Sequence, residues 1–237
     1  MDYHFSQKFF IGYSDIDRNN KIKLSKVVDL LQNTATSHSK TVGYGTEEMM
    51  QRKQGWLVLA WKVKIIKYPT ADMYVEVRTW SKKNKGLHAY RDFEIVDENG
   101  NALILAMSSW VLYDLETKRP SRDLTEMLEK YGAIDRDALD DGFTKLGIGN
   151  EQSNIVEQAE IIVGKRDIDT NGHTNNAKYL DFMMEAFPDD LEIGEIELEY
   201  KKQAMYGEKL AVEFDGEFCT IKNENSEIMT IAKLKAE

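Results

Sequence analysis

Two segments of the chain have the apolar spacing of an amphipathic helix. In the first, apolar residues recur at every third or fourth position over 24–42, with Ser25 placed as an N-cap and Gly43-Tyr44-Gly45 ending the pattern. In the second, the same spacing relates four residues that precede a proline: Leu180, Met183, Met184 and Phe187. We therefore predict one helix in each half of the chain, the first of them long.

Each predicted helix lies between strand patterns. One strand is expected before the first helix at 9–13, and another before the second at 158–164. After the first helix, alternating or continuously apolar segments predict four strands: 56–66, 74–80, 89–96 and 102–113. After the second helix, alternation recurs in three segments: 196–200, 210–214 and 228–234. In each half, an antiparallel sheet wrapped around one helix would bury the apolar faces of both.

The two halves also share residues. A shift of 152 positions aligns six identical pairs: Asp15 with Asp167, Ile16 with Ile168, Asp17 with Asp169, Asn19 with Asn171, Lys26 with Lys178 and Asp29 with Asp181. Together with the repeated order of elements, this indicates a duplication. Lys21 stands where the second copy has His173, so an imidazole that titrates near neutral pH is available in the second copy alone. We predict two similar domains and one active site.

The fold class that follows is α+β. We expect an N-terminal domain over 1–125 and a C-terminal domain over 158–237. The stretch between them, 126–157, is acidic and less regular, and we interpret it as an ordered linker.

Composition then limits the class of protein. The 237 residues are 42% hydrophobic and 30% charged, which is typical of a soluble globular protein with a large core. A net charge of −10 argues against general binding of nucleic acid. The single cysteine, Cys219, excludes an internal disulfide framework and fits a reducing compartment. With no signal-peptide pattern and no apolar run of membrane-spanning length, we expect a cytoplasmic protein without a membrane span.

Polar side chains are concentrated in the segment 167–176, immediately before the second helix. Asx-rich loops often do no more than cap helices, so Asn175 and Asn176 could have that role alone. The acids that this loop shares with the first copy could likewise be structural in both halves. A purely structural loop is therefore one open interpretation.

Metal binding is a weaker interpretation of the same segment. Asp167, Asp169, Asn171 and Gly172 match the opening of an EF-hand loop, but the twelfth position, which needs a glutamate, is Lys178. The four histidines have neither a cysteine cluster nor close pairing. We expect no metal.

Hydrolysis is the third interpretation. His173 could act as a general base, with Asp169 orienting it or activating water itself. Asn171 and backbone N–H groups at the helix start could stabilise an oxyanion. Cys219 occupies an ordinary strand position and the chain has no Gly-x-Ser-x-Gly motif, so direct attack by water is the simpler hypothesis.

The loop from Asp167 to Asn176, with Tyr179 and Glu185 beyond it, resembles the signature of the acyl-acyl-carrier-protein (acyl-ACP) thioesterases, in their bacterial form. Further motifs agree in order along most of the chain: Leu31-Gln32-Asn33-Thr34-Ala35, Trp61 with Tyr68-Pro69, Thr79-Trp80, Tyr90-Arg91-Asp92-Phe93 and Ser109-Trp110-Val111. The resemblance implies a tandem double hotdog fold. It also implies hydrolysis of fatty acyl-ACP thioesters to free fatty acid, without a cofactor.

By the same resemblance, the catalytic Asp, Asn and His of the family fall on Asp169, Asn171 and His173. A further family Glu, followed by Cys in the plant enzymes, falls on Gln203 and Ala204. Ala204 cannot be a nucleophile, and Gln203 cannot be a base although it can hold water. The hypothesis is that Asn171 polarises the carbonyl, Asp169 and His173 activate water, and Gln203 positions it; which of the two takes the proton is open.

An acidic carrier protein would need a cationic docking patch. Two lysine clusters are candidates, although the first would also suit a solvated turn: Lys82, Lys83 and Lys85, and Lys201 with Lys202. We expect the acyl chain in an apolar tunnel of the first half. That half holds all four tryptophans, although a core position is the favoured interpretation for any one of them. An acyl-CoA thioesterase and a non-catalytic acyl-binding hotdog protein are the alternatives. Chain-length preference stays open, and either a monomer or a homodimer is expected.

Overall fold

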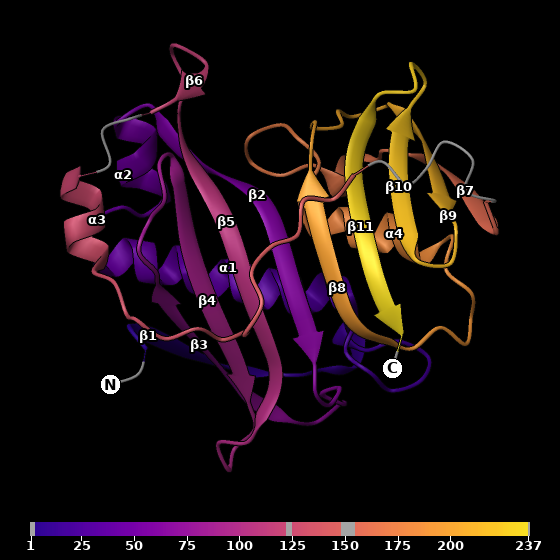
Figure 1. Ribbon diagram of the computed structural model, residues 1–237, viewed down its shortest axis with the longest axis horizontal. Coiled ribbons are helices and arrows are strands. Elements are labelled where there is room, and N and C mark those ends of the chain that lie inside the picture. Colours follow the sequence, from indigo (N-terminus) through magenta and orange to yellow (C-terminus); the bar gives the residue numbers. More distant parts are fainter. Residues whose placement is uncertain (1–2, 122–124, 148–154, 237) are drawn as a thin grey trace. The chain divides into compact units, whose positions relative to one another are not determined.

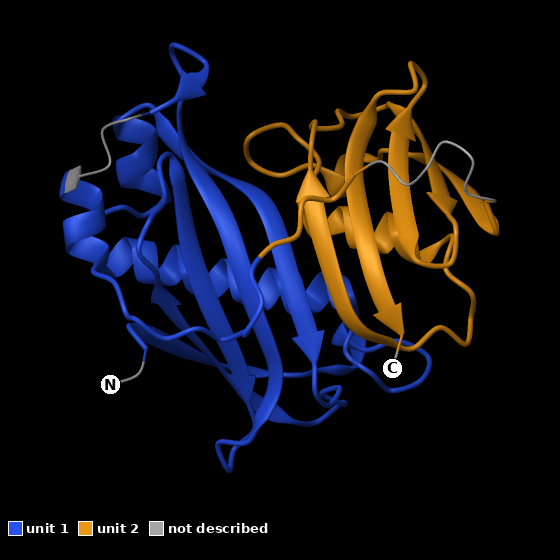
Figure 2. Cartoon of the chain, in the orientation of Figure 1, with its two compact units in different colours: residues 1–142 blue, residues 143–237 orange. Residues whose placement is uncertain are grey.

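The structure is a computed structural model that describes residues 3–121, 125–147 and 155–236. The chain divides into two compact units, Met1–Gly142 and Phe143–Glu237 (Figure 2). Residues 126–142 of the predicted linker thus fall in the first unit, while its residues 148–154 lie outside the described part. In the described residues no helix is both long and apolar enough to cross a bilayer.

The first unit is an antiparallel sheet with one long helix on one face (Figure 1). Its main strands run in the order β1-β3-β4-β5-β2. Their bounds are Phe5–Phe10 for β1, Gln54–Ile65 for β2, Tyr74–Ser81 for β3, His88–Val96 for β4 and Ala102–Asp114 for β5, with a short β6, Arg119–Pro120, beside β5. The long helix α1, Leu24–Thr41, packs against β1 and β3. Two short helices complete the unit: α2, Thr46–Gln51, and α3, Thr125–Tyr131.

Apolar periodicity explains α1. Val27, Val28, Leu31 and Ala35 are all buried, as the predicted helical face requires. The helix ends before Gly43, which has a positive φ of 81° and whose N–H donates to the Lys40 carbonyl. The predicted N-cap was wrong: Lys23 holds that position, and Ser25 is buried inside the first turn.

The second unit repeats this plan with a shorter helix. Its strands run in the order β7-β9-β10-β11-β8, which is the order of the first unit element for element. Their bounds are Glu157–Ile162 for β7, Ile193–Tyr200 for β8, Lys209–Phe214 for β9, Phe218–Asn223 for β10 and Ile228–Ala236 for β11. The helix α4, Lys178–Met184, has seven residues against eighteen in α1. Its Tyr179 ring contacts Tyr200 of β8, so the helix lies on the sheet.

A 3-10 turn precedes the loop before each helix. These turns are η1, Tyr13–Asp15, and η2, Lys165–Asp167, again 152 positions apart. In each turn the last aspartate accepts a hydrogen bond from the backbone N–H of a glycine three residues earlier: Asp15 from Gly12 at 3.0 Å and Asp167 from Gly164 at 2.8 Å. The predicted duplication is therefore confirmed in strand order, turns and side-chain contacts.

Candidate active site

The loop between η2 and α4 is organised by the side chain of Asp169. Its Oδ1 accepts hydrogen bonds from the backbone N–H groups of Asn171 at 2.8 Å and His173 at 3.3 Å. The Asp169 N–H donates to the His173 carbonyl at 2.8 Å. Gly172 takes a positive φ of 81° at the tip, which glycine adopts without steric cost. The three predicted residues of the catalytic loop therefore share one tight turn.

This turn leaves two groups available for chemistry. Asp169 Oδ2 has a long contact of 3.4 Å to Asn171 Nδ2 and no closer partner among the described residues. The imidazole of His173 makes no hydrogen bond to another described residue. Asn171 is exposed, whereas Asp169 and His173 are half-buried. A carboxylate oxygen with only this long hydrogen bond and an imidazole at the same turn are groups that could activate water.

The first unit contains the same turn without the histidine. Asp17 Oδ1 accepts hydrogen bonds from the N–H groups of Asn19 at 2.8 Å and Lys21 at 3.0 Å. Asn20 takes the positive φ that Gly172 has in the second copy. The structural interpretation of the shared acids is therefore confirmed for both Asp17 and Asp169. For Asp169 this role accounts for one carboxylate oxygen and not the other.

The segment that carries Gln203 is fastened to this loop by its next residue. The carbonyl of Ala204 accepts hydrogen bonds from the Thr174 N–H at 3.0 Å and the Thr174 hydroxyl at 2.8 Å. The Ala204 N–H donates to the Tyr179 hydroxyl at 2.8 Å. Thr174 follows His173 and Ala204 follows Gln203, so this clamp brings the backbones of His173 and Gln203 close together. The side chain of Gln203 is exposed.

The corresponding positions of the first unit show how the two side chains can meet. There Ile22, the counterpart of Thr174, donates its N–H to the carbonyl of Pro69 at 2.9 Å, so Pro69 corresponds to Ala204. Tyr68 then corresponds to Gln203, and Lys21 to His173. The Lys21 ammonium lies 5.0 Å from the centre of the Tyr68 ring. In the first unit, therefore, the side chains at these two positions face each other.

Sequence reasoning missed Thr174 and the role of Tyr179. The hydroxyl of Thr174 adds a bond that Ile22 cannot make in the first copy. Comparison of the two copies could have indicated this position, because a polar residue there replaces an apolar one. The position of the partner, Ala204, could not be read from the sequence, since it is thirty residues away.

Other sequence interpretations of the loop have separate outcomes. The predicted cap at Asn175 was wrong: Ala177 holds the N-cap position of α4, and Asn175 Oδ1 accepts a hydrogen bond from the Ala177 N–H at 2.9 Å in the turn before the helix. Cys219 is fully buried in β10, and burial raises the pKa of its thiol, which disfavours the nucleophilic thiolate. Within the described residues, no three His, Cys, Asp or Glu side chains form a cluster suited to a metal ion.

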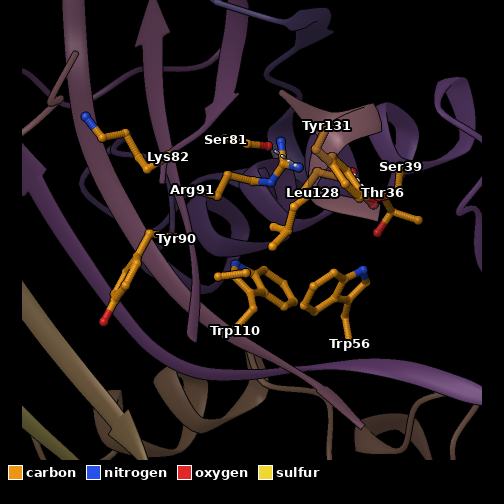
Figure 3. Close-up of a pocket in the computed structure, with 12 residues that line it drawn as sticks. Thr36, Ser39, Trp56, Ser81, Lys82, Tyr90, Arg91, Trp110, Leu128 and Tyr131 are labelled. Atoms are coloured by element: carbon orange, nitrogen blue, oxygen red, sulfur yellow. Dashed lines mark hydrogen bonds between the residues drawn. The ribbon is translucent and has the colours of Figure 1, made fainter. Parts of the chain in front are cut away.

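A pocket in the first unit has two of the four tryptophans in its wall. Trp56 of β2 and Trp110 of β5 line it and are half-buried (Figure 3). Trp61 and Trp80 are instead completely buried core residues. The interpretation as core is thus confirmed for Trp61 and Trp80. The location of the acyl chain in this pocket stays a prediction.

The candidate docking lysines differ in their surroundings. Lys82 Nζ is 2.7 Å from Asp137 and also donates to the Arg136 carbonyl. Lys201 pairs with Glu199 and Lys202 with Glu227. Lys83 and Lys85 are exposed in the β3–β4 connection and form no ion pair with a described residue.

Two consecutive units with one strand order, each with a helix on its sheet, define a double hotdog protein. The family model for the N-terminal domain of acyl-ACP thioesterases matches residues 2–131, and the model for the C-terminal domain matches residues 150–237. The chain belongs to the acyl-ACP thioesterase family.

Individual relatives agree with this assignment. The chloroplastic acyl-[acyl-carrier-protein] hydrolase FATB2 of Cuphea viscosissima is 30% identical over 84% of this chain and 52% of its own length. The 12:0-ACP thioesterase from Umbellularia californica is 26% identical, with a TM-score of 0.85 over 98% of this chain and 96% of that chain. An acyl-ACP thioesterase from Bacteroides thetaiotaomicron has the same fold, with a TM-score of 0.85 at 20% identity over 98% of this chain and 97% of that one. The chain spans about half the length of the curated relatives it matches.

Proposed function

We propose that this protein hydrolyses the thioester of fatty acyl-ACP and releases the free fatty acid, which ends chain elongation. The observation that carries the proposal is the match of family models to both halves of the chain. The turn of Asp169, Asn171 and His173 supports it, because the second unit alone combines the carboxylate with an imidazole. We place the reaction in the cytoplasm, because the single cysteine, Cys219, is a buried free thiol and fits a reducing compartment.

In the proposed mechanism, water attacks the thioester carbonyl carbon and the C–S bond breaks. Asp169 Oδ2 or His173 takes the proton of the water, and that proton then goes to the departing thiolate. The exposed amide of Asn171 donates a hydrogen bond to the carbonyl oxygen as negative charge develops there. Gln203, held beside His173 by the Thr174–Ala204 clamp, positions the water. No cofactor is needed.

The acyl chain belongs, in this proposal, to the pocket lined by Trp56 and Trp110. The carrier protein docks through Lys83 and Lys85, because neither lysine is neutralised by an ion pair with a described residue. Lys82, Lys201 and Lys202 already have carboxylate partners, so we give them a smaller part in docking.

The test is fatty acid release from acyl-ACP substrates of several chain lengths, run beside the coenzyme A thioester of each chain. We expect a higher kcat/KM for the carrier-protein thioester at every length that is cleaved. Asp169→Asn serves as the active-site control and should lower release by about 10²-fold or more. Equal or better cleavage of the coenzyme A thioesters would favour an acyl-CoA thioesterase. Binding of acyl chains without turnover would favour a non-catalytic protein.

A further inference from the structure

The pocket of the first unit ends in a buried positive charge. The guanidinium of Arg91, on β4, lines the pocket, and the residue is 8% exposed (Figure 3). Burial lowers the pKa of Arg91 to about 10, so it remains a cation at neutral pH. An isolated buried charge costs several kcal/mol unless a counter-charge compensates it.

The partners of Arg91 within the described residues are all neutral. Nη1 donates to His38 Nδ1 at 2.9 Å and to Thr79 Oγ1 at 3.2 Å, and Nη2 donates to Ser81 Oγ at 3.2 Å. Because arginine can only donate, Nδ1 of His38 must be the unprotonated nitrogen. Burial and Arg91 together lower the pKa of His38 to about 3, so the imidazole carries no charge.

The neighbouring carboxylate is directed elsewhere. Asp92 follows Arg91 on β4 and so points to the opposite face of the sheet. There its Oδ2 accepts a hydrogen bond from the Ala138 N–H at 2.8 Å. Among the described residues, no carboxylate forms an ion pair with Arg91.

Two N–H groups of Arg91 are unused by the described protein. A guanidinium has five N–H donors, of which three are accounted for. The unused donors are the Nε–H and one N–H of Nη2, and guanidinium N–H groups donate strong, charge-assisted hydrogen bonds to carboxylate oxygens.

A second donor in the pocket also lacks a partner. The Tyr131 hydroxyl, on α3, is buried without a well-formed hydrogen bond to a described residue, although Ser39 and Trp56 lie beside it. Tyr131 is 5% exposed, and its ring lies 5.3 Å from the Arg91 guanidinium carbon. Figure 3 shows both side chains in the polar part of the pocket, with Trp56, Trp110 and Leu128 forming its apolar part.

We propose that this pocket binds the carboxylate of an acid with an apolar chain, held by the unused N–H groups of Arg91 and the hydroxyl of Tyr131. The chain would lie against Trp56, Trp110 and Leu128. One source of such a ligand is the free fatty acid, an identification that rests on the proposed function. The other source is a carboxylate at the far end of an acyl chain that is still bound as a thioester.

Binding to the intact protein tests this site without any turnover. Decanoate and decanol are titrated by calorimetry into the wild type, Arg91→Met, Tyr131→Phe and, as a matched control, Lys83→Met, which removes an exposed cation. We expect decanoate to bind about tenfold or more tightly than decanol to the wild type and to the control, as charge-assisted hydrogen bonds require. Arg91→Met should remove this preference while leaving decanol binding unchanged.

Tyr131→Phe keeps the inference testable if Arg91→Met fails to fold. It removes a hydroxyl that makes no well-formed hydrogen bond to a described residue, so it should weaken decanoate binding several-fold without lowering the melting temperature. Equal affinity for acid and alcohol in the wild type would overturn the proposal. So would an acid preference that persists in Arg91→Met or, if that variant does not fold, one that is undiminished in Tyr131→Phe.

Two further experiments distinguish the two sources of the carboxylate and test this binding site independently of the proposed catalytic mechanism. Asp169→Asn should bind decanoate like the wild type even though it cannot turn over thioester, so a failure of the catalytic scheme would leave this result intact. A thioester of a long dicarboxylic acid is compared with its monocarboxylic analogue. Faster cleavage of the former, lost in Arg91→Met, would identify the far end of the substrate as the source; decanoate binding without that difference would identify the free acid.

Discussion

The two carboxylate oxygens of Asp169 have different surroundings, and we assign them different roles. Oδ1 holds the turn through the N–H groups of Asn171 and His173, as Asp17 Oδ1 does in the first copy. Oδ2 has only a long hydrogen bond from Asn171 at 3.4 Å, and in the proposed mechanism it can take the proton of water. Asparagine keeps an acceptor at Oδ1 and loses the basic oxygen, so an Asp→Asn change separates the two tasks.

We predict that Asp169→Asn and Asp17→Asn have the same small effect on stability and different effects on activity. The kcat of Asp169→Asn should fall by about 10²–10⁴-fold, the range of general base catalysis, while Asp17→Asn keeps wild-type kcat. Fatty acid release and thermal unfolding of both variants measure this. Full activity in Asp169→Asn, or an equal loss in both variants, would contradict a chemical role for Oδ2.

Among individual residues, those of the loop before α4 could be predicted from the sequence, but the residues that pack around this loop could not. Asp169, Asn171 and His173 lie within five residues, and comparison of the two copies distinguished the histidine. Gln203 could be placed only by family resemblance, since a tertiary hydrogen bond between Thr174 and Ala204 brings it near. The burial of Arg91 was not foreseen, because charged side chains on a strand are normally expected at the surface.

The hydrogen bonds between Thr174 and Ala204 join the loop before α4 to the β8–β9 connection. Thr174→Val should lose the hydroxyl bond to Ala204 and keep the backbone bond, at a cost of about 1 kcal/mol in the free energy of unfolding. Because Gln203 is adjacent to Ala204, kcat should fall while KM changes little. Thr170→Val, at an exposed position of the same loop, is the control. Denaturant unfolding and steady-state kinetics test it, and an unchanged kcat in Thr174→Val would separate the clamp from catalysis.

Several strand positions were predictable because alternation of apolar residues follows from the pleat, although β1 covers Phe5–Phe10 instead of the predicted 9–13 and the bounds of β10 were not predicted. The predicted segments 74–80, 89–96 and 102–113 correspond to β3, β4 and β5 within one residue at each end. It was less predictable which side chains of a strand point toward the core. The pairing of β2 with β5 shifts register between Val58 and Ala60, so Leu59 is an extra residue. Such a bulge reverses which side chains point inward, and nothing in the local sequence marks it.

At the scale of the whole molecule, a net charge of −10 opposes an acidic partner. Docking then depends on local cations, and we predict that Lys83→Glu with Lys85→Glu raises KM for acyl-ACP severalfold at low salt, with less effect on kcat. Lys64→Glu with Lys67→Glu changes net charge equally at two other exposed lysines and is the control. An equal rise in KM for both double variants would show that net charge, not a docking patch, is responsible.

Two buried titratable groups of the first unit oppose each other in their effect on stability. Burial raises the pKa of Asp92 from 3.8 to about 6, so the unfolded chain ionises first and stability falls as pH rises through this window. The pKa of His38, lowered from 6.5 to about 3 by burial and by Arg91, has the reverse effect. The unfolded chain binds that proton first, and stability falls as pH drops below 6.5. Between pH 3.8 and about 6, the contributions of Asp92 and His38 to the free energy of unfolding therefore partly cancel.

Asp92→Asn removes one contribution and leaves the other. At pH 7 we expect the variant to be more stable than the wild type, by on the order of 2–3 kcal/mol at most, because it no longer buries a carboxylate. Its Oδ1 can still accept the hydrogen bond from the Ala138 N–H. The difference should shrink on acidification and vanish near pH 4, so the variant should lose stability more steeply than the wild type. Urea unfolding of both proteins across pH 4–7 measures this, and a difference that is constant with pH would refute the ionisation of buried Asp92 as its cause.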